Sequence, residues 1–584
     1  MVSVSDVRRW RQPTLDAAFQ ALGSRRDTLV GFDDELHGTK SPPGWSGPAA
    51  EAATKHHGEL TERMRRLVAG ISAVRRAVGE AADAVKAVQR ALGDAEHMAG
   101  KHGFSIADDG KIFDVAHPRP TDETQIRERL FIRIELADRV EQVLRRANDI
   151  DADLAAVLER AALDRIDDGC GTSLNDASLA GQATGGLSTI GPPKGGSPDD
   201  NAGWWSSLSD AERAAMLKEH PDWLGNLDGL PAVVRDQANR AQLPVERAKL
   251  NEEVSRLEKE IHDIGQRMLR SSSERTDLSL AHQLAAARAK LAATQENVAS
   301  LDAIDKTLSR GDRQLLVFDP SGARHKAAIA SGNVDTAEHV TVFTPGLGTT
   351  VRGDMPAYDD HMNKLRDVAE RASEREGKPT SVAAVTWIGY EAPQATLDEL
   401  LNKNRSVMSD AAARSGAEKL TGFLNGVDAS RTTDPHLTAI GHSYGSLTTG
   451  LALQKGTGVD DAVFFGSPGL GTSNLEDLKV RPGHSWVVEA RGDPVAEFGT
   501  FGRDPDLLGA GLLSAKDVTL PDGRHLNASV GHASVEPKVG YLAPGTTSQY
   551  NMGLVSAGLH DLVQRDKPLG LGELFRQRAR RGPY

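Results

Sequence analysis

One serine in the chain stands between glycines in a pattern suited to nucleophilic catalysis. The run from Gly441 to Gly445 reads Gly-His-Ser-Tyr-Gly and is the only Gly-x-Ser-x-Gly match in the 584 residues. Residues 437–440 predict a buried strand before it, and residues 447–454 predict a helix after it. Strand, tight turn and helix present a serine above a sheet, with a helix N-terminus facing a developing oxyanion. Ser443 is therefore the candidate nucleophile, and a plain Gly/Ser-rich turn is the alternative.

A serine hydroxyl needs a base that takes its proton, and the base needs an orienting acid. In this arrangement the acid follows the serine along the chain and the histidine follows the acid. Asp493 stands in a turn, 491–494, after an apolar run that predicts a strand. We therefore expect Asp493 to be the acid, with Asp504 and Asp506 as alternatives.

Three histidines beyond Asp493 are candidates for the base. His532 follows Gly531 in a loop after the last expected strand. His525 belongs to a turn signature at 521–524, and His560 lies in a helical run at 554–563, so these two histidines are the alternatives. His532 is the predicted base.

The tetrahedral intermediate of acyl transfer needs two backbone N–H donors. One is expected from Tyr444, directly after the nucleophile. The other is expected from the glycine-rich loop 344–349, which follows an apolar run at 340–343. Leu347 and Gly348 are the predicted donors, against the alternative of a loop whose glycines serve only a tight turn.

The elements that must position these residues begin near residue 314. Short apolar runs alternate there with helical stretches, as the buried strands of a mostly parallel sheet do. The expected strands are 315–318, 340–343, 382–388, 437–440, 462–465 and 486–490. We predict a doubly wound α/β-hydrolase fold over residues 314–565, followed by a tail at 566–584.

The preceding residues predict all-α helical hairpins. Apolar residues at heptad spacing from Leu60 to Leu92 predict a long helix, paired with an earlier one, in a domain at 1–165 that ends with a helix over 122–163. Residues 166–203 are rich in Gly, Ser, Pro and Asp and predict a flexible linker. A second heptad series predicts a helical hairpin region at 204–313.

Composition narrows the classes of function. The net charge of −13 argues against sequence-independent nucleic-acid binding. The single cysteine, Cys170, excludes an internal disulfide and a cysteine-type zinc site. No apolar stretch is long enough for a membrane span, and no secretory signal peptide is expected. No metal-binding or nucleotide-binding motif appears, so no metal and no cofactor are expected.

Two resemblances add to this interpretation. Residues 5–97, with Trp45-Ser46-Gly47 between two helices, resemble the WXG-type hairpins of actinobacterial type VII (ESX) secretion. That resemblance implies a helical partner protein or export by a type VII route, with a cytoplasmic location as the alternative. The family's Tyr-x-x-x-Asp/Glu export element has no counterpart, because the first tyrosine is Tyr358.

The remainder, from Trp204 on, resembles an actinobacterial α/β-hydrolase family long catalogued as a domain of unknown function. The matching stretches are 223–231, 345–349, 387–393, 441–445, 466–469, 502–505 and 531–532. The resemblance implies a serine hydrolase with a Ser–Asp–His triad and no defined substrate. We expect hydrolysis of a small-molecule or lipid ester. The alternative is a secretion-associated interaction protein, or an exported effector, whose hydrolase fold is silent or specialised.

Overall fold

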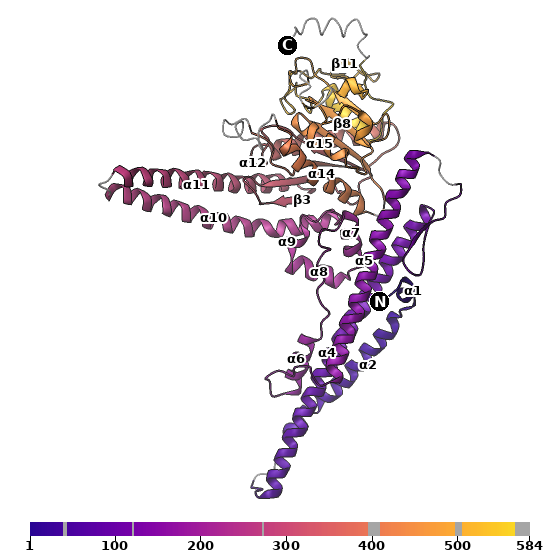
Figure 1. Cartoon of the computed structure of the whole chain (residues 1–584), viewed down its shortest axis with the longest axis vertical. Coiled ribbons are helices and arrows are strands. Elements are labelled where there is room, and N and C mark those ends of the chain that lie inside the picture. Colours follow the sequence, from indigo (N-terminus) through magenta and orange to yellow (C-terminus); the bar gives the residue numbers. More distant parts are fainter. Residues whose placement is uncertain are drawn as a thin grey trace. The chain divides into compact units, whose positions relative to one another are not determined.

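The computed structural model describes residues 1–38, 44–118, 122–270, 274–394, 409–431, 433–496, 501 and 505–566. The chain divides into two compact units, Met1–Lys218 and Glu219–Tyr584 (Figure 1). Of the expected tail, 566–584, the residues from 567 on lie outside the described part of the chain. None of the described helices combines the length and the apolar character needed to cross a bilayer.

The first unit is almost entirely helical. Its elements are α1 (Val4–Arg9), α2 (Gln12–Gly31), α3 (Asp33–Gly38), α4 (Pro48–Lys101), β1 (Phe104–Ile106), β2 (Ile112–Asp114), α5 (Glu123–Ala162), α6 (Leu174–Thr184), α7 (Pro198–Ser207) and α8 (Asp210–Glu219). A Cβ at Gly79 of α4 would lie 2.9 Å from the Phe19 ring of α2, and one at Gly23 would lie 2.9 Å from Arg75. The two helices thus run antiparallel, as a hairpin.

The buried face of α4 differs from the predicted heptad seam. Leu60 and Leu67 are each 50% exposed, whereas most of the buried positions from Val68 to Ala99 are alanines. The physical reason is that α4 packs against α2, α5 and α6 together. Small side chains let several helices approach one another closely, so the buried surface extends beyond a single seam of large residues.

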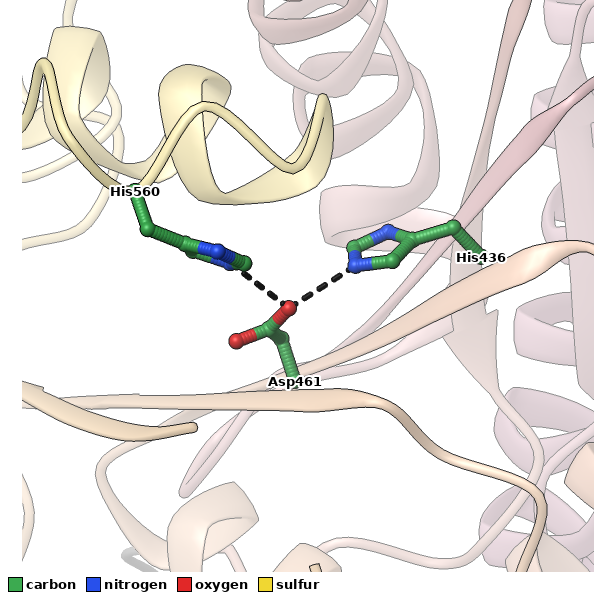
Figure 2. A group of neighbouring side chains, drawn as sticks. All are labelled: His436, Asp461 and His560. Carbon is green, nitrogen blue, oxygen red and sulfur yellow. Dashed lines mark hydrogen bonds and ion pairs between the residues drawn. The ribbon is translucent and has the colours of Figure 1, made fainter. Parts of the chain in front are cut away.

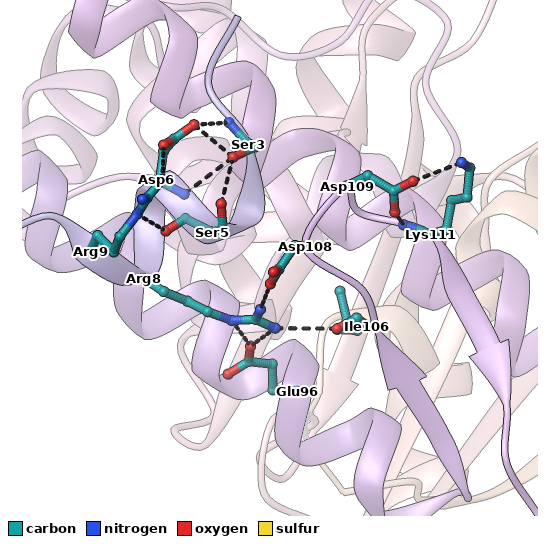
Figure 3. A network of polar contacts seen from close by, with 10 residues as sticks. All are labelled: Ser3, Ser5, Asp6, Arg8, Arg9, Glu96, Ile106, Asp108, Asp109 and Lys111. Atoms are coloured by element: carbon teal, nitrogen blue, oxygen red, sulfur yellow. Dashed lines mark hydrogen bonds and ion pairs between the residues drawn. The ribbon is translucent and has the colours of Figure 1, made fainter.

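The short helix α1 is fastened to the unit by Arg8 (Figure 3). Its guanidinium donates to Glu96 Oε1 of α4 at 2.7 and 2.8 Å, to Asp108 at 2.5 Å and to the carbonyl of Ile106 at 3.2 Å. Ser3 and Asp6 form a capping box at the start of the helix. One side chain therefore links the N-terminal turn to α4 and to the β1–β2 hairpin.

Residues 166–203, expected to be a flexible linker, contain α6 and most of α7. Both helices begin with a serine capping box, at Ser173 and Ser197. A Cβ at Gly181 or Gly185 would overlap the carbonyl oxygen of Ala69 or Ala73 on α4. The glycines of this segment thus permit a close contact between helices. A glycine-rich composition is also typical of disordered segments, so composition alone does not separate the two cases.

This contact predicts the effect of one added methyl group. Gly181→Ala should destabilise the first unit by about 1–3 kcal/mol, because α6 must move away from α4. Gly93→Ala is the control, since Gly93 is an exposed position of α4 with open space around it. It should stabilise the helix by about 0.5–1 kcal/mol. Urea unfolding measures both changes in stability, and amide hydrogen exchange over residues 174–184 measures the loosening of α6 in Gly181→Ala. Unchanged protection there would contradict the close contact.

The second unit begins with helices. They are α9 (Pro221–Leu224), α10 (Ala232–Arg270) and α11 (Glu274–Leu308). Figure 1 shows α10 and α11 side by side, and Arg247 of α10 donates to Asp302 and Asp305 of α11, both at 2.7 Å. The predicted helical hairpin is present within the second unit, although residues 204–218 belong to the first.

An eight-stranded sheet forms the centre of the second unit, in the order β10-β9-β8-β7-β5-β6-β4-β3. Its strands are β3 (Arg313–Asp319), β4 (Lys326–Ser331), β5 (His339–Thr344), β6 (Val382–Ile388), β7 (His436–His442), β8 (Asp461–Phe465), β9 (Ser485–Val488) and β10 (Gly511–Leu513). Strand β4 pairs antiparallel with β3 and with β6, and the other pairs are parallel. The six expected strands are all present, whereas β4 and β10 were not predicted.

Helices cover both faces of this sheet, as the near-continuous apolar strands require. Helices α12 (Val351–Arg375) and α16 (Thr547–Ser556) pack on one face, and α14 (Ala411–Ala429) and α15 (Tyr444–Leu453) pack on the other. Alternate residues of β7 enter the two cores, with Ile440 in the first and Leu437 and Ala439 in the second. The remaining short elements are Leu475–Leu478, Pro505–Leu508, β11 (Val518–Thr519) and β12 (His525–Leu526). The predicted doubly wound, mostly parallel sheet is confirmed.

Candidate functional site

Ser443 lies in a sharp turn between β7 and α15. Its backbone has φ 53° and ψ −131°, a conformation that side-chain-bearing residues seldom adopt. The Ser443 N–H donates to the carbonyl of Phe465 on β8 at 3.1 Å. A Cβ at Gly445 would overlap the carbonyl of Thr344, so only glycine lets the turn approach the end of β5. The turn thus has the strained strand-to-helix geometry of a nucleophile elbow.

His532 and Asp493 lie beside Ser443. His532 Nε2 is 2.9 Å from Ser443 Oγ, and His532 Nδ1 is 2.9 and 3.0 Å from the two Asp493 oxygens. An ionised carboxylate only accepts hydrogen bonds, so Nδ1 carries the proton and Nε2 is the acceptor for the serine hydroxyl. The structure therefore brings these three predicted residues together at the carboxyl ends of the strands.

Backbone contacts between two loops hold His532 opposite Asp493. Arg491 and Val530 form an isolated parallel bridge, and the Gly531 N–H donates to the Arg491 carbonyl at 3.1 Å. Gly466, at the end of β8, leaves the space that both side chains need. A Cβ there would lie 2.8 Å from Asp493 Oδ2 and 3.1 Å from the His532 ring.

The carboxylate of Asp493 is fully enclosed. Tyr541 donates its hydroxyl proton to Asp493 Oδ2 at 2.7 Å, and Val495 and Ala496 donate backbone N–H groups to Oδ1 at 2.9 and 3.3 Å. Burial alone would raise the pKa of Asp493, but the hydrogen bonds from His532 and Tyr541 outweigh it and lower the pKa below its ordinary value. Asp493 thus stays ionised and fixes the tautomer of His532.

Sequence reasoning missed two side chains that support this arrangement. Tyr541 also accepts the Ala490 N–H at 2.7 Å, which ties it to the end of β9. His442 donates from Nε2 to the His532 carbonyl at 3.0 Å and stacks on Phe465. The position of His442 inside the Gly-x-Ser-x-Gly run could have indicated that it lies at the site. No motif in the sequence around Tyr541 indicates a role there.

The loop after β5 lies against the elbow. A Cβ at Gly346 would be 2.8 Å from Ser443 Cβ and 2.9 Å from the Tyr444 nitrogen. The Gly348 N–H donates to the Pro393 carbonyl at 2.8 Å, so it is already engaged. The Leu347 N–H has no acceptor in the part of the chain that the structure describes, and Tyr444 is the first residue of α15, where helix geometry leaves the N–H unpaired.

The alternative residues lie elsewhere or outside the described part. His525 is exposed on β12, and His560 contacts Asp461 at the other edge of the sheet. Asp504 lies outside the described residues, as does the side chain of Asp506.

A cavity of roughly 420 Å³ opens at Ser443. It is lined by Leu347, Tyr358, His442, Ser443, Tyr444, Pro468, Val495, Phe501, His532, Ala533, Ser534 and Val535. Half of these side chains are apolar, two more are tyrosines, and none of them is an aspartate, glutamate, lysine or arginine. The cavity therefore suits an uncharged group beside the serine oxygen.

His442 makes the stability of this site depend on pH. Burial, together with the nearby His532 imidazole, lowers the pKa of His442 to about 3, against about 6.5 in an unfolded chain. Below pH 6.5 His442 binds a proton in the unfolded chain but not in the folded protein. The free energy of unfolding therefore decreases as the pH falls toward 3. His442→Gln keeps an N–H donor but cannot titrate.

Urea unfolding between pH 6 and pH 4 tests this dependence. The free energy of unfolding should fall less steeply in His442→Gln, by about 1.4 kcal/mol per pH unit. His325 and His339, whose pKa burial also lowers to about 4, remain in both proteins and so do not affect the comparison. Parallel profiles for the two proteins would contradict a neutral, buried His442.

Comparisons with known proteins agree with this architecture. A family model described as alpha/beta hydrolase matches residues 319–502. An uncharacterized protein of Mycobacterium tuberculosis (strain H37Rv) is 37% identical over 237 residues, covering 39% of this chain and 86% of that protein. A second uncharacterized protein of the same strain is 28% identical over 332 residues, covering 56% of this chain and 48% of that protein.

Among solved structures, a hyperthermophilic esterase from the archaeon Pyrobaculum calidifontis aligns with 47% of this chain and 93% of its own, at 12% identity and a TM-score of 0.27. The residues matched by the family model fall in the unit that contains the eight-stranded sheet. The chain belongs to the alpha/beta hydrolase family.

Proposed function

We propose that the chain is a serine hydrolase that cleaves carboxylic esters, with Ser443 as nucleophile, His532 as base and Asp493 as the orienting acid. The observation that carries the proposal is the position of His532. Its Nε2 lies 2.9 Å from Ser443 Oγ while its Nδ1 meets the Asp493 carboxylate. A serine with a base at this distance is activated for attack on a carbonyl carbon, because the base takes the hydroxyl proton. A serine without such a base is not activated.

The reaction proceeds in two halves. Ser443 Oγ attacks the ester carbonyl as its proton passes to His532 Nε2, and the tetrahedral intermediate collapses when His532 returns that proton to the leaving alcohol. Water then attacks the acyl-enzyme by the same route, with His532 again as base, and releases the acid. Asp493 holds the imidazolium in place and is not itself protonated.

The oxyanion of each intermediate is assigned to two backbone donors. They are the N–H groups of Tyr444 and Leu347, two residues that line the cavity at Ser443. Gly348, expected as an alternative donor, is left out because its N–H already donates to Pro393. Removing one such donor costs roughly 100- to 1000-fold in rate in enzymes of this kind.

The cavity suggests the class of substrate. Its volume of roughly 420 Å³ falls in the range of small-molecule sites, and Val495, Phe501 and Val535 give it apolar walls. We therefore assign the acyl side of the substrate to an uncharged, apolar group. A charged acyl group would lose its hydration there without gaining a partner.

Hydrolysis of p-nitrophenyl esters tests the function. The wild-type chain should release p-nitrophenol from uncharged acyl esters, and Ser443→Ala should lower kcat/KM by at least about 10⁴-fold because the acyl-enzyme cannot form. Ser534→Ala is the matched control, because Ser534 lines the same cavity and its hydroxyl donates to the Tyr358 hydroxyl at 3.3 Å and not to a residue of the proposed triad. It should stay within about tenfold of wild type.

Three outcomes would count against the proposal. Equal loss in both variants would assign the effect to the cavity rather than to the nucleophile. Retained turnover in Ser443→Ala would remove the nucleophile assignment. No turnover of any ester by the folded wild-type chain would favour the silent-fold alternative.

A further inference from the structure

A second group of titratable side chains lies at the opposite edge of the same sheet. His436 is the first residue of β7 and Asp461 the first of β8, while His560 follows α16. Ser443 comes directly after the other end of β7, so a strand of seven residues, roughly 20 Å, separates the two groups. The catalytic proposal uses none of these residues, and the present inference does not depend on it.

The three side chains converge on one point (Figure 2). His436 Nε2 and His560 Nε2 each lie 2.8 Å from the same oxygen, Asp461 Oδ2. The three ligand atoms all lie within 4.8 Å of one another. They come from positions 25 and 99 residues apart, so the fold alone brings them together.

Further contacts fix the orientation of the carboxylate. Its second oxygen, Asp461 Oδ1, accepts the Trp486 indole N–H at 2.9 Å and lies 3.0 Å from His484 Nδ1. The indole of Trp486 also stacks on the His560 ring, with centroids 5.6 Å apart. Such outer contacts are the ones that orient ligands in metal sites.

The carboxylate of this group is buried in the protein, and its two imidazoles are partly exposed to solvent. The Asp461 side chain is fully buried, while the side chains of His436 and His560 are 22% and 24% exposed. Because both imidazoles are partly exposed, an ion and a water molecule have a path to the group from solvent. An entry path of this kind is a requirement for any metal site.

We propose that His436, Asp461 and His560 bind one divalent transition-metal ion, with Zn²⁺ as the best match. Two imidazole nitrogens and one carboxylate oxygen are ligands that Zn²⁺ takes, with water in the fourth position of a tetrahedron. Ligand atoms at zinc distances lie about 3.3 Å apart, so the present 2.8 Å spacings must open by about half an ångström. Each histidine binds the ion as the Nδ1–H tautomer, so a neutral ring exchanges its Nε2 proton for one on Nδ1, and an imidazolium ring releases its Nε2 proton to solvent.

The ion would join segments that are far apart in sequence. His560 belongs to the stretch after α16, whereas His436 and Asp461 begin two central strands. Binding to the folded state alone stabilises it, because the unfolded chain holds the three ligands apart. The role assigned to the ion is therefore structural, at an edge of the sheet remote from Ser443.

Isothermal titration of the metal-free full chain with Zn²⁺ tests the site. We expect one equivalent to bind and the melting temperature to rise. His436→Gln and His560→Gln should each weaken binding by about 100-fold or more, because each removes a ligand. His361→Gln is the control: His361 lies on α12, and its Nδ1 is 2.8 Å from the Ala357 carbonyl of the same helix, so binding should be unchanged.

Two further measurements keep the inference testable if a ligand variant folds poorly. The wild-type chain loaded with Co²⁺ should show the visible absorption of tetrahedral cobalt. Binding should also persist in His532→Ala, which separates this site from the serine site. Absence of binding to wild type, or equal binding to the His436→Gln/His560→Gln double variant, would overturn the proposal and leave a hydrogen-bonded network around Asp461.

Discussion

The backbone of Ser443 is held at φ 53° and ψ −131°, which costs a residue with a side chain about 1–3 kcal/mol. Packing around the turn holds the backbone in this conformation. Every residue of α15 is buried, and the Ser443 N–H donates to the Phe465 carbonyl. Neighbouring atoms lie so close to Gly346, Gly445 and Gly466 that a Cβ at any of these positions would collide with them. The strain is therefore sustained by the packing of two strands, one helix and two loops.

The same parallel strands carry different chemistry at their two ends. At the carboxyl ends lie the elbow, Gly466 and the loop that holds Asp493, and the side chains there leave an apolar cavity open. At the amino ends, His436 and Asp461 lie opposite His560. A rigid sheet, buried on both faces, fixes the geometry at both edges and keeps them a strand length apart. Ligands of open α/β sheets bind outside the carboxyl ends of the strands, and the serine site follows that rule while the histidine cluster does not.

Sequence patterns predicted this unit well where the signal was local. The six strands and the turn at the Gly-x-Ser-x-Gly run could be predicted from short runs of sequence. Strand β4 was missed because three of its six residues are alanines, which are depleted in strands, and burial on both faces outweighs that preference. Tyr541 and the group around Asp461 were missed because their partners are distant in sequence. Helix α6 was mistaken for linker because glycine marks both flexibility and close packing.

The central claim, that Ser443 is an activated nucleophile, is tested most directly by mapping a covalent adduct. A fluorophosphonate reacts with a serine hydroxyl only when a neighbouring base withdraws its proton and an oxyanion site accepts the phosphoryl oxygen. Mass spectrometry of the digested, labelled chain should find the adduct on the peptide that contains Ser443. An adduct confined to another serine, or an unlabelled Ser443 in the folded chain, would contradict the account.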